Sequence, residues 1–115
     1  MNHHIHIILD QKSTKDQRIQ AAFKLENMAD KEAISALGHA LLTDPSPIVR
    51  HECAFSLGET ATPKHAGPYL IKAIKTDPHP FVKHEALMAL GTLGDHAFIP
   101  FITPFLNDPD PNIAE

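Results

Sequence analysis

Apolar residues recur every three or four positions along most of this 115-residue chain. The clearest stripes place apolar residues at i, i+4 and i+8, and they occur in two copies: Val49, Cys53 and Leu57, then Val82, Ala86 and Leu90. This period is that of an α-helix with one buried face. We expect both stripes to lie in a core, and Cys53 to be a small packing residue rather than a metal ligand.

The same periodicity predicts helices on either side of these stripes. A helix over residues 15–27 is expected to have an apolar face made of Ile19, Ala22, Phe23, Leu25 and, near its end, Met28. Asp30 is a favourable N-cap residue for the helix that follows it, which runs through Ile34, Leu37, Leu41 and Leu42. Later helices have apolar faces at Tyr69, Leu70, Ala73 and Ile74, and at Phe98, Ile102, Phe105 and Leu106.

These helices belong to a unit that repeats every 32 or 33 residues. Leu25, Leu57 and Leu90 are equivalent positions near the end of the first helix of each unit. An Asp-Pro-x-Pro turn stands at 44–47, 77–80 and 108–111, and its second proline fits the first position of a helix. Gly58 and Gly91 fall near helix ends, where a left-handed residue is favoured, although Gly58 can also be helical.

Three helix pairs of this length indicate an all-α fold, an α-solenoid in a single domain. The units are about 14–44, 45–77 and 78–108, and residues 109–115 begin a fourth. A solenoid end without a polar closing repeat leaves an apolar face. A second copy of the chain is the simplest cover, and the expected contact residues are Phe105, Leu106 and Ile113.

The composition of the chain argues against several kinds of function and location. The net charge of −4 and the absence of a Lys/Arg cluster argue against binding to nucleic acid. No apolar run is long enough to span a membrane, and no signal peptide is recognisable at the N-terminus. A single cysteine cannot form an internal disulfide, so a cytoplasmic location is the simplest expectation.

One polar motif occurs twice at the repeat interval. His51-Glu52 and His84-Glu85 each follow a basic residue at the start of a first helix, 33 residues apart. Equivalent positions in stacked units lie on one surface, and imidazole with carboxylate is a ligand set for a transition metal. A solvated polar face is the alternative, because glutamate is favourable in the first turns of any helix. The first unit has Ile19-Gln20 instead, so the fold does not require the motif.

The N-terminal segment carries three further histidines, His3, His4 and His6, among isoleucines. This segment has two possible interpretations. The segment can be a leading helix or arm that covers the first unit, or it can form a terminal metal site of the His-x-His kind.

The segments 17–25, 49–58 and 82–95 together resemble one half of deoxyhypusine hydroxylase, a solenoid of HEAT-like repeats related to the phycocyanobilin-lyase type. That family carries two His-Glu pairs in each of two halves, which together hold a non-haem di-iron centre that uses dioxygen to hydroxylate a modified lysine. The resemblance implies that His51, Glu52, His84 and Glu85 are iron ligands. Residues 110–115 also resemble the start of a further repeat of this kind.

The chain departs from that family because it has two His-Glu pairs where the family has four. A symmetric homodimer would restore the number of ligands, and the resemblance then implies an iron-binding, oxygen-activating protein of the monooxygenase type. The substrate does not follow, because a two-fold site need not fit an asymmetric protein substrate. A non-catalytic scaffold for protein–protein interaction is the alternative function, and chromophore chemistry by analogy with lyase-type repeats is a third.

Overall fold

The computed structural model describes residues 2–94 and shows six helices and no strand within that range. In chain order the helices are α1 (His3–Leu9), α2 (Lys15–Met28), α3 (Lys31–Thr43), α4 (Pro47–Glu59), α5 (Pro63–Thr76) and α6 (Pro80–Leu93). The predicted all-α class is confirmed, and the predicted helices of the first unit agree with α2 and α3 to within one or two residues.

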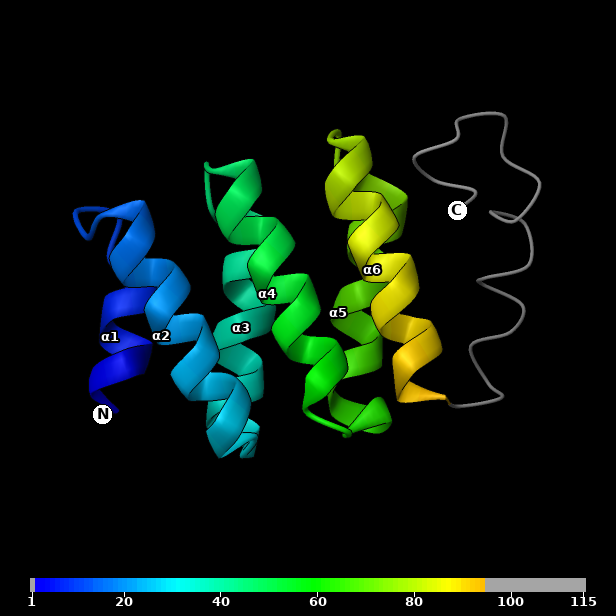
Figure 1. Ribbon diagram of the computed structural model, residues 1–115, viewed down its shortest axis with the longest axis horizontal. Coiled ribbons are helices and arrows are strands. Elements are labelled where there is room, and N and C mark those ends of the chain that lie inside the picture. The colour runs from blue at the N-terminus through cyan, green and yellow to red at the C-terminus, as the bar shows by residue number, and fades with distance from the viewer. Residues whose placement is uncertain (1, 95–115) are drawn as a thin grey trace.

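The helices form two layers of a solenoid. The first helices of the units, α2, α4 and α6, lie side by side in one layer, while α3 and α5 pack behind them (Figure 1). The short helix α1 packs against α2 and α3 at the N-terminal end, where Ile5 and Ile8 are buried. The N-terminal segment is therefore a leading helix that covers the first helix pair.

The core consists mainly of the predicted stripes. All six residues of the two central stripes are fully buried, and Cys53 is among them. The expected face of α2 is wrong in part, because Phe23 and Met28 are exposed while Arg18 and Ala21 are buried. Two apolar rows run along α2, and the row through Ala22 and Leu25 is the buried one.

Capping residues set the ends of the helices. Pro47 and Pro80 each open a helix as expected, and the side chain of Asp30 accepts a hydrogen bond from the Ala33 N–H group. Gly91 was expected near a C-cap, but it lies inside α6, which ends at the left-handed residue Gly94 (φ 69°). Ala29 takes the same left-handed conformation at the end of α2, although its Cβ atom makes that conformation less favourable than it is for glycine.

Arginine side chains of low exposure link the first helix of a unit to the turn that leads into the next unit. Arg18 Nε donates to Asp44 Oδ2 at 2.9 Å, and Arg50 Nε donates to Asp77 Oδ2 at 2.8 Å. Each aspartate begins an Asp-Pro-x-Pro turn and also accepts a backbone N–H two residues later, at 2.9 Å in both turns. The Arg50 guanidinium donates in addition to the Asp44 carbonyl oxygen at 2.9 Å, so it connects the turn before its helix to the turn after it.

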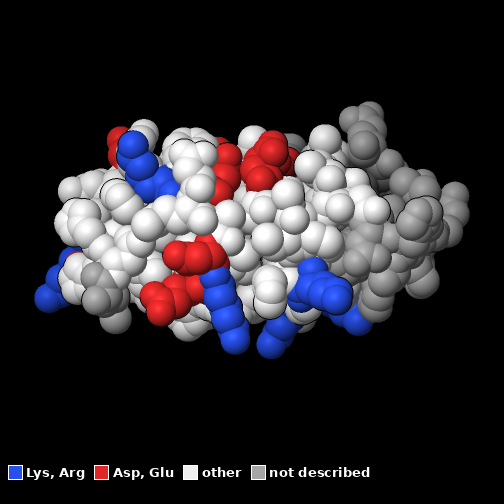
Figure 2. All heavy atoms as spheres, turned by 90° about the horizontal axis from the view of Figure 1, so that it is seen from below, with Lys and Arg blue, Asp and Glu red and all other residues white. Residues whose placement is uncertain are grey.

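The surface of the described part carries mixed charge. Lys and Arg side chains are scattered among Asp and Glu on the face shown in Figure 2. None of the described helices is both long and apolar enough to span a membrane.

We expect Asp44→Asn to lower the free energy of unfolding by about 3 kcal/mol, because it leaves the buried Arg18 guanidinium without a counter-ion. The asparagine oxygen can still accept the Ser46 N–H, so the local turn is preserved. Urea denaturation followed by circular dichroism measures the change. Asp16→Asn, at an exposed site in the first turn of α2, is the matched control. Equal effects of the two substitutions would contradict a structural role for the buried pair.

Candidate metal centre

The two His-Glu pairs lie on adjacent helices of the first layer. His51 and Glu52 belong to the early turns of α4, and His84 and Glu85 occupy the equivalent turns of α6. All four side chains are half-buried. The α-solenoid therefore brings the predicted ligands to one surface, as the repeat spacing indicated.

His51 is the residue that connects the two pairs. Its Nε2 atom lies 3.6 Å from Glu85 Oε2 on the neighbouring helix, and its Nδ1 atom lies 3.7 Å from Glu52 Oε1 on its own helix. Both distances are too long for a hydrogen bond. The imidazole thus stands between two carboxylates without being tied to either of them.

Two buried imidazole nitrogens lack hydrogen-bond partners. The Nδ1 atoms of His51 and His84 are inaccessible to solvent and make no hydrogen bond within the protein. An unpaired buried polar atom is costly, and a metal ion satisfies a neutral imidazole nitrogen through its lone pair. The donor set of two imidazoles and two carboxylates therefore fits a transition metal such as ferrous iron.

The four side chains do not converge on one point within a single chain. Among residues 2–94, no group of three His, Cys, Asp or Glu side chains is close enough to hold a metal ion. Within the described residues, the side chains of His51, Glu52, His84 and Glu85 form a row along α4 and α6 rather than a closed coordination sphere.

A close contact between α4 and α6 sets the separation of the row. A Cβ atom placed on Gly58 would lie 2.8 Å from Ala89 Cβ and 2.9 Å from Ala89 Cα. Helices that approach this closely have no room for a side chain at the contact. The glycine therefore sets how near His51 comes to Glu85, although His51 lies nearly two turns before it on α4.

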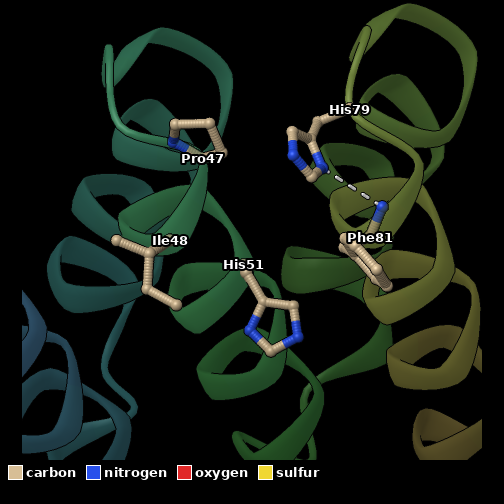
Figure 3. A pocket seen from close by; sticks show the side chains of 5 residues that line it. All are labelled: Pro47, Ile48, His51, His79 and Phe81. Atoms are coloured by element: carbon tan, nitrogen blue, oxygen red, sulfur yellow. Dashed lines mark hydrogen bonds between the residues drawn. The ribbon is translucent and has the colours of Figure 1, made fainter.

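A hollow of about 320 Å³ opens beside His51, between the N-terminal turns of α4 and α6. Its lining residues are Pro47, Ile48, His51, His79 and Phe81 (Figure 3). Ile48 and Phe81 are 49% and 55% exposed, so both offer apolar surface to the solvent. His79 Nδ1 accepts the Phe81 N–H at 3.3 Å, which leaves the proton of a neutral ring on Nε2.

The pattern of the sequence does not by itself reveal this hollow. Ile48 and Phe81 each precede a histidine of the motif by three residues, which places them on the same helix face. This three-residue spacing is the sequence feature that indicates apolar side chains beside both histidines. The residues alone could not show that the two side chains flank one depression.

Residues outside the two His-Glu pairs have other surroundings. His39 and His65 are exposed on the second layer. Burial raises the pKa of the Cys53 thiol, with smaller contributions from the nearby charges of Asp44 and Glu52, so this thiol stays protonated. Phe105, Leu106 and Ile113 lie outside the described residues, and their role at an interface stays a prediction.

Comparison with known proteins agrees with the observed architecture. The HEAT repeats family matches residues 4–77, which is more than half of the chain. The chain belongs to the HEAT-repeat family. A PBS lyase HEAT-like repeat also matches residues 82–108.

Within the HEAT-repeat proteins, the chain is similar to part of deoxyhypusine hydroxylase. It is 40% identical to the Schizosaccharomyces pombe enzyme over 65 residues, which is 56% of this chain and 20% of the enzyme. The Drosophila pseudoobscura pseudoobscura enzyme is 41% identical over 64 residues, with the same shares. These matches therefore span about a fifth of the curated relatives.

The similarity extends to a solved structure. Human deoxyhypusine hydroxylase in complex with glycerol superposes with a TM-score of 0.89 at 29% identity. The match covers 96% of this chain and 38% of the human protein. The suspected resemblance to one half of such an enzyme is confirmed at the level of sequence and fold.

We expect Gly58→Ala to lower the free energy of unfolding by about 1–3 kcal/mol, because the new methyl group meets the Ala89 backbone and forces α4 and α6 apart. Gly91→Ala is the matched control, since nothing lies within 4 Å of a Cβ atom there. That control should be stabilising by about 0.5–1 kcal/mol, the helix preference of alanine over glycine. Chemical denaturation of both variants measures the difference, and a destabilised Gly91→Ala beside an unaffected Gly58→Ala would refute the assigned contact.

Proposed function

We propose that this HEAT-repeat protein binds iron through His51, Glu52, His84 and Glu85 and acts as a non-haem hydroxylase whose di-iron centre forms between two copies of the chain. The observation that carries this proposal is the pair of buried, unpartnered Nδ1 atoms at equivalent positions on neighbouring helices. The similarity to deoxyhypusine hydroxylase, whose solved human structure matches 96% of this chain, supports the choice of iron and of oxygen chemistry.

Each residue of the row has a distinct task in this function. His51 and His84 would donate neutral imidazole nitrogens, and Glu52 and Glu85 would donate carboxylate oxygens that offset the charge of the metal. Bound ferrous iron supplies the binding and activation of dioxygen. The 3.6 Å separation of His51 from Glu85 lets both groups move onto an ion without first breaking a hydrogen bond.

Two copies of the chain are required because one row leaves a coordination sphere open. Exposed apolar residues stand about one turn from the motif on both helices, with Ile48 and Phe81 before the two histidines and Met88 after Glu85. Apolar surface around half-buried ligands suits contact with a second row that carries the same groups. In this arrangement the first-helix layers face each other, whereas contact through Phe105, Leu106 and Ile113 would join the copies end to end.

The iron content of anaerobically purified protein tests the ligand assignment. We expect the wild-type protein to retain iron and His51→Ala/His84→Ala to lose nearly all of it, because the variant lacks both imidazole ligands. His39→Ala/His65→Ala is the matched control, since it removes two exposed histidines from the second layer. Iron that is negligible in the wild type, or equal in all three proteins, would sink the assignment.

The oligomeric state tests the shared centre independently. Light scattering should show a dimer for the wild type and a monomer for Ile48→Ser/Phe81→Ser, because the substitutions remove apolar area bordering the row. The monomeric variant should also bind less iron. Leu9→Ser/Met28→Ser, which removes exposed apolar residues elsewhere, should remain dimeric. A monomeric wild type with full iron content would show that one chain suffices.

A non-catalytic scaffold is the second candidate function, and the exposed apolar residues Ile48 and Phe81 favour it. A scaffold would use the same face to hold another protein and would need no metal. The two functions differ in their iron dependence. A scaffold predicts that His51→Ala/His84→Ala keeps the assembly state of the wild type, whereas the di-iron function predicts that iron removal weakens the dimer.

A further inference from the structure

The hollow beside His51 has apolar walls that the repeat does not require. Ile48 on α4 and Phe81 on α6 occupy equivalent positions and stand on opposite sides of the hollow (Figure 3). The equivalent position of α2 carries Asp16, a charged residue. Since the fold accepts a charge at this position, the two exposed apolar side chains are not needed for packing, and a concave apolar surface is typical of a ligand site.

The lining of the hollow carries no permanent charge. Besides Ile48 and Phe81 it consists of Pro47, His51 and His79, and none of these described lining residues is Asp, Glu, Lys or Arg. The volume of about 320 Å³ lies at the lower end of the range of small-molecule pockets, about 300–1,000 Å³. A group that fills this space is therefore small and mainly apolar, and it is uncharged because an unpaired charge is costly to remove from water.

His79 supplies a directed hydrogen-bond donor to the hollow. Its Nδ1 atom accepts the Phe81 N–H at 3.3 Å, which orients the ring and leaves the proton of the neutral imidazole on Nε2. The Nε2 atom lies on the side of the ring opposite that bond, toward Pro47 across the hollow (Figure 3). The Nε2–H group can therefore donate to an acceptor atom of a ligand.

The start of α6 does not depend on this histidine. Ser46 occupies the equivalent place before α4, and its side chain makes no capping hydrogen bond. Pro47 and Pro80 open the two helices in the same way. Because α4 begins without a side-chain cap, the cap alone does not account for an imidazole at position 79, whereas donation to a ligand does.

We propose that the hollow binds an uncharged, mainly apolar group with one hydrogen-bond acceptor, such as an alcohol or carbonyl oxygen, and that His79 selects this group. Ile48 and Phe81 contact the apolar body of the ligand. His79 lies at the end of the hollow near the N-terminal turns, and His51 lies at the opposite end (Figure 3). An acceptor held by His79 consequently leaves the apolar body pointing toward His51, the proposed iron ligand.

The hollow is then the substrate subsite of the proposed hydroxylase. In that role the inference rests on the proposed function, whereas the binding itself needs no iron. A cationic side chain is disfavoured as the substrate, because no carboxylate lines the hollow. Glu52 and Glu85, which lie 3.7 and 3.6 Å from the ring nitrogens of His51, are outside the lining and are used by the metal in the proposed function.

NMR titration of the full chain with benzyl alcohol, toluene and benzylamine tests the subsite. The protein is treated with a chelator, so that paramagnetic iron does not broaden the signals. The three probes share a ring with a one-carbon arm and differ in the polar group on that arm. We expect saturable shifts of the His79 and Phe81 signals, with benzyl alcohol bound about fivefold more tightly than toluene because it gains one hydrogen bond. Benzylamine, a cation at neutral pH, should bind more weakly than both.

Variants of His79 separate selection of the ligand from a structural role. His79→Ser copies Ser46 of the equivalent turn, so it should fold, lose the preference for benzyl alcohol and bind toluene as the wild type does. His79→Asn should keep part of the preference, because its amide oxygen can accept the Phe81 N–H while its NH₂ group donates. A merely structural role would change the affinities for both probes alike. His39→Ala/His65→Ala, on the second layer, is the matched control and should leave all three affinities unchanged.

The outcomes distinguish this inference from the proposed function. Absence of saturable shifts around the hollow, equal affinities for the three probes, or tighter binding of benzylamine would each overturn the subsite. The expected order of affinities in a protein that retains no iron when purified anaerobically would refute the proposed function and leave the binding site standing. Retained iron without binding of any probe would refute the subsite alone.

Discussion

The solenoid depends on the arginine–aspartate pairs at the turns between its units, Arg18–Asp44 and Arg50–Asp77. Each arginine lies in the first helix of a unit and forms an ion pair with the aspartate that starts the turn into the next unit. The side chains of Arg18 and Asp44 are only 6% and 1% exposed, so the charges compensate each other away from water. Because the same aspartate also orders its own turn, the pair fixes both the start of the following helix and its position relative to the previous one.

That constraint explains why the candidate ligands form a row. Once α4 and α6 start at equivalent turns and approach closely at Gly58, residues at equivalent positions must lie side by side. His51 and Glu85 then come within 3.6 Å across the interface although they are distant in sequence. The row therefore results from the repeat geometry. Its chemistry depends on which residue types stand at the equivalent positions of successive units.

The sequence predicted the architecture well because periodicity, proline and capping signals all act locally. The stripes through Cys53 and Ala86 could be recognised as core since every third or fourth residue in them is apolar. Periodicity failed at Phe23, because α2 has two neighbouring apolar rows and the packing of α1, α4 and α3 against it decides which one is buried. The residue types and the register of the two His-Glu pairs followed from the repeat. The tight Gly58–Ala89 contact and the unpaired Nδ1 atoms of His51 and His84 arise from tertiary packing, which the sequence pattern does not show.

The double attachment of Arg50 has an architectural consequence. This one side chain holds the carbonyl of Asp44 behind it and the carboxylate of Asp77 ahead of it. A segment from 45 to 77 consequently contains the arginine that contacts the preceding unit, through the Asp44 carbonyl, and the aspartate that orders the turn into the following unit. Such a segment is a self-contained module, and an in-frame duplication of it would lengthen the array by one step while adding a third histidine–glutamate pair in register. The number of His-Glu pairs can thus vary through tandem duplication, because each added segment brings its own contacts to the neighbouring units.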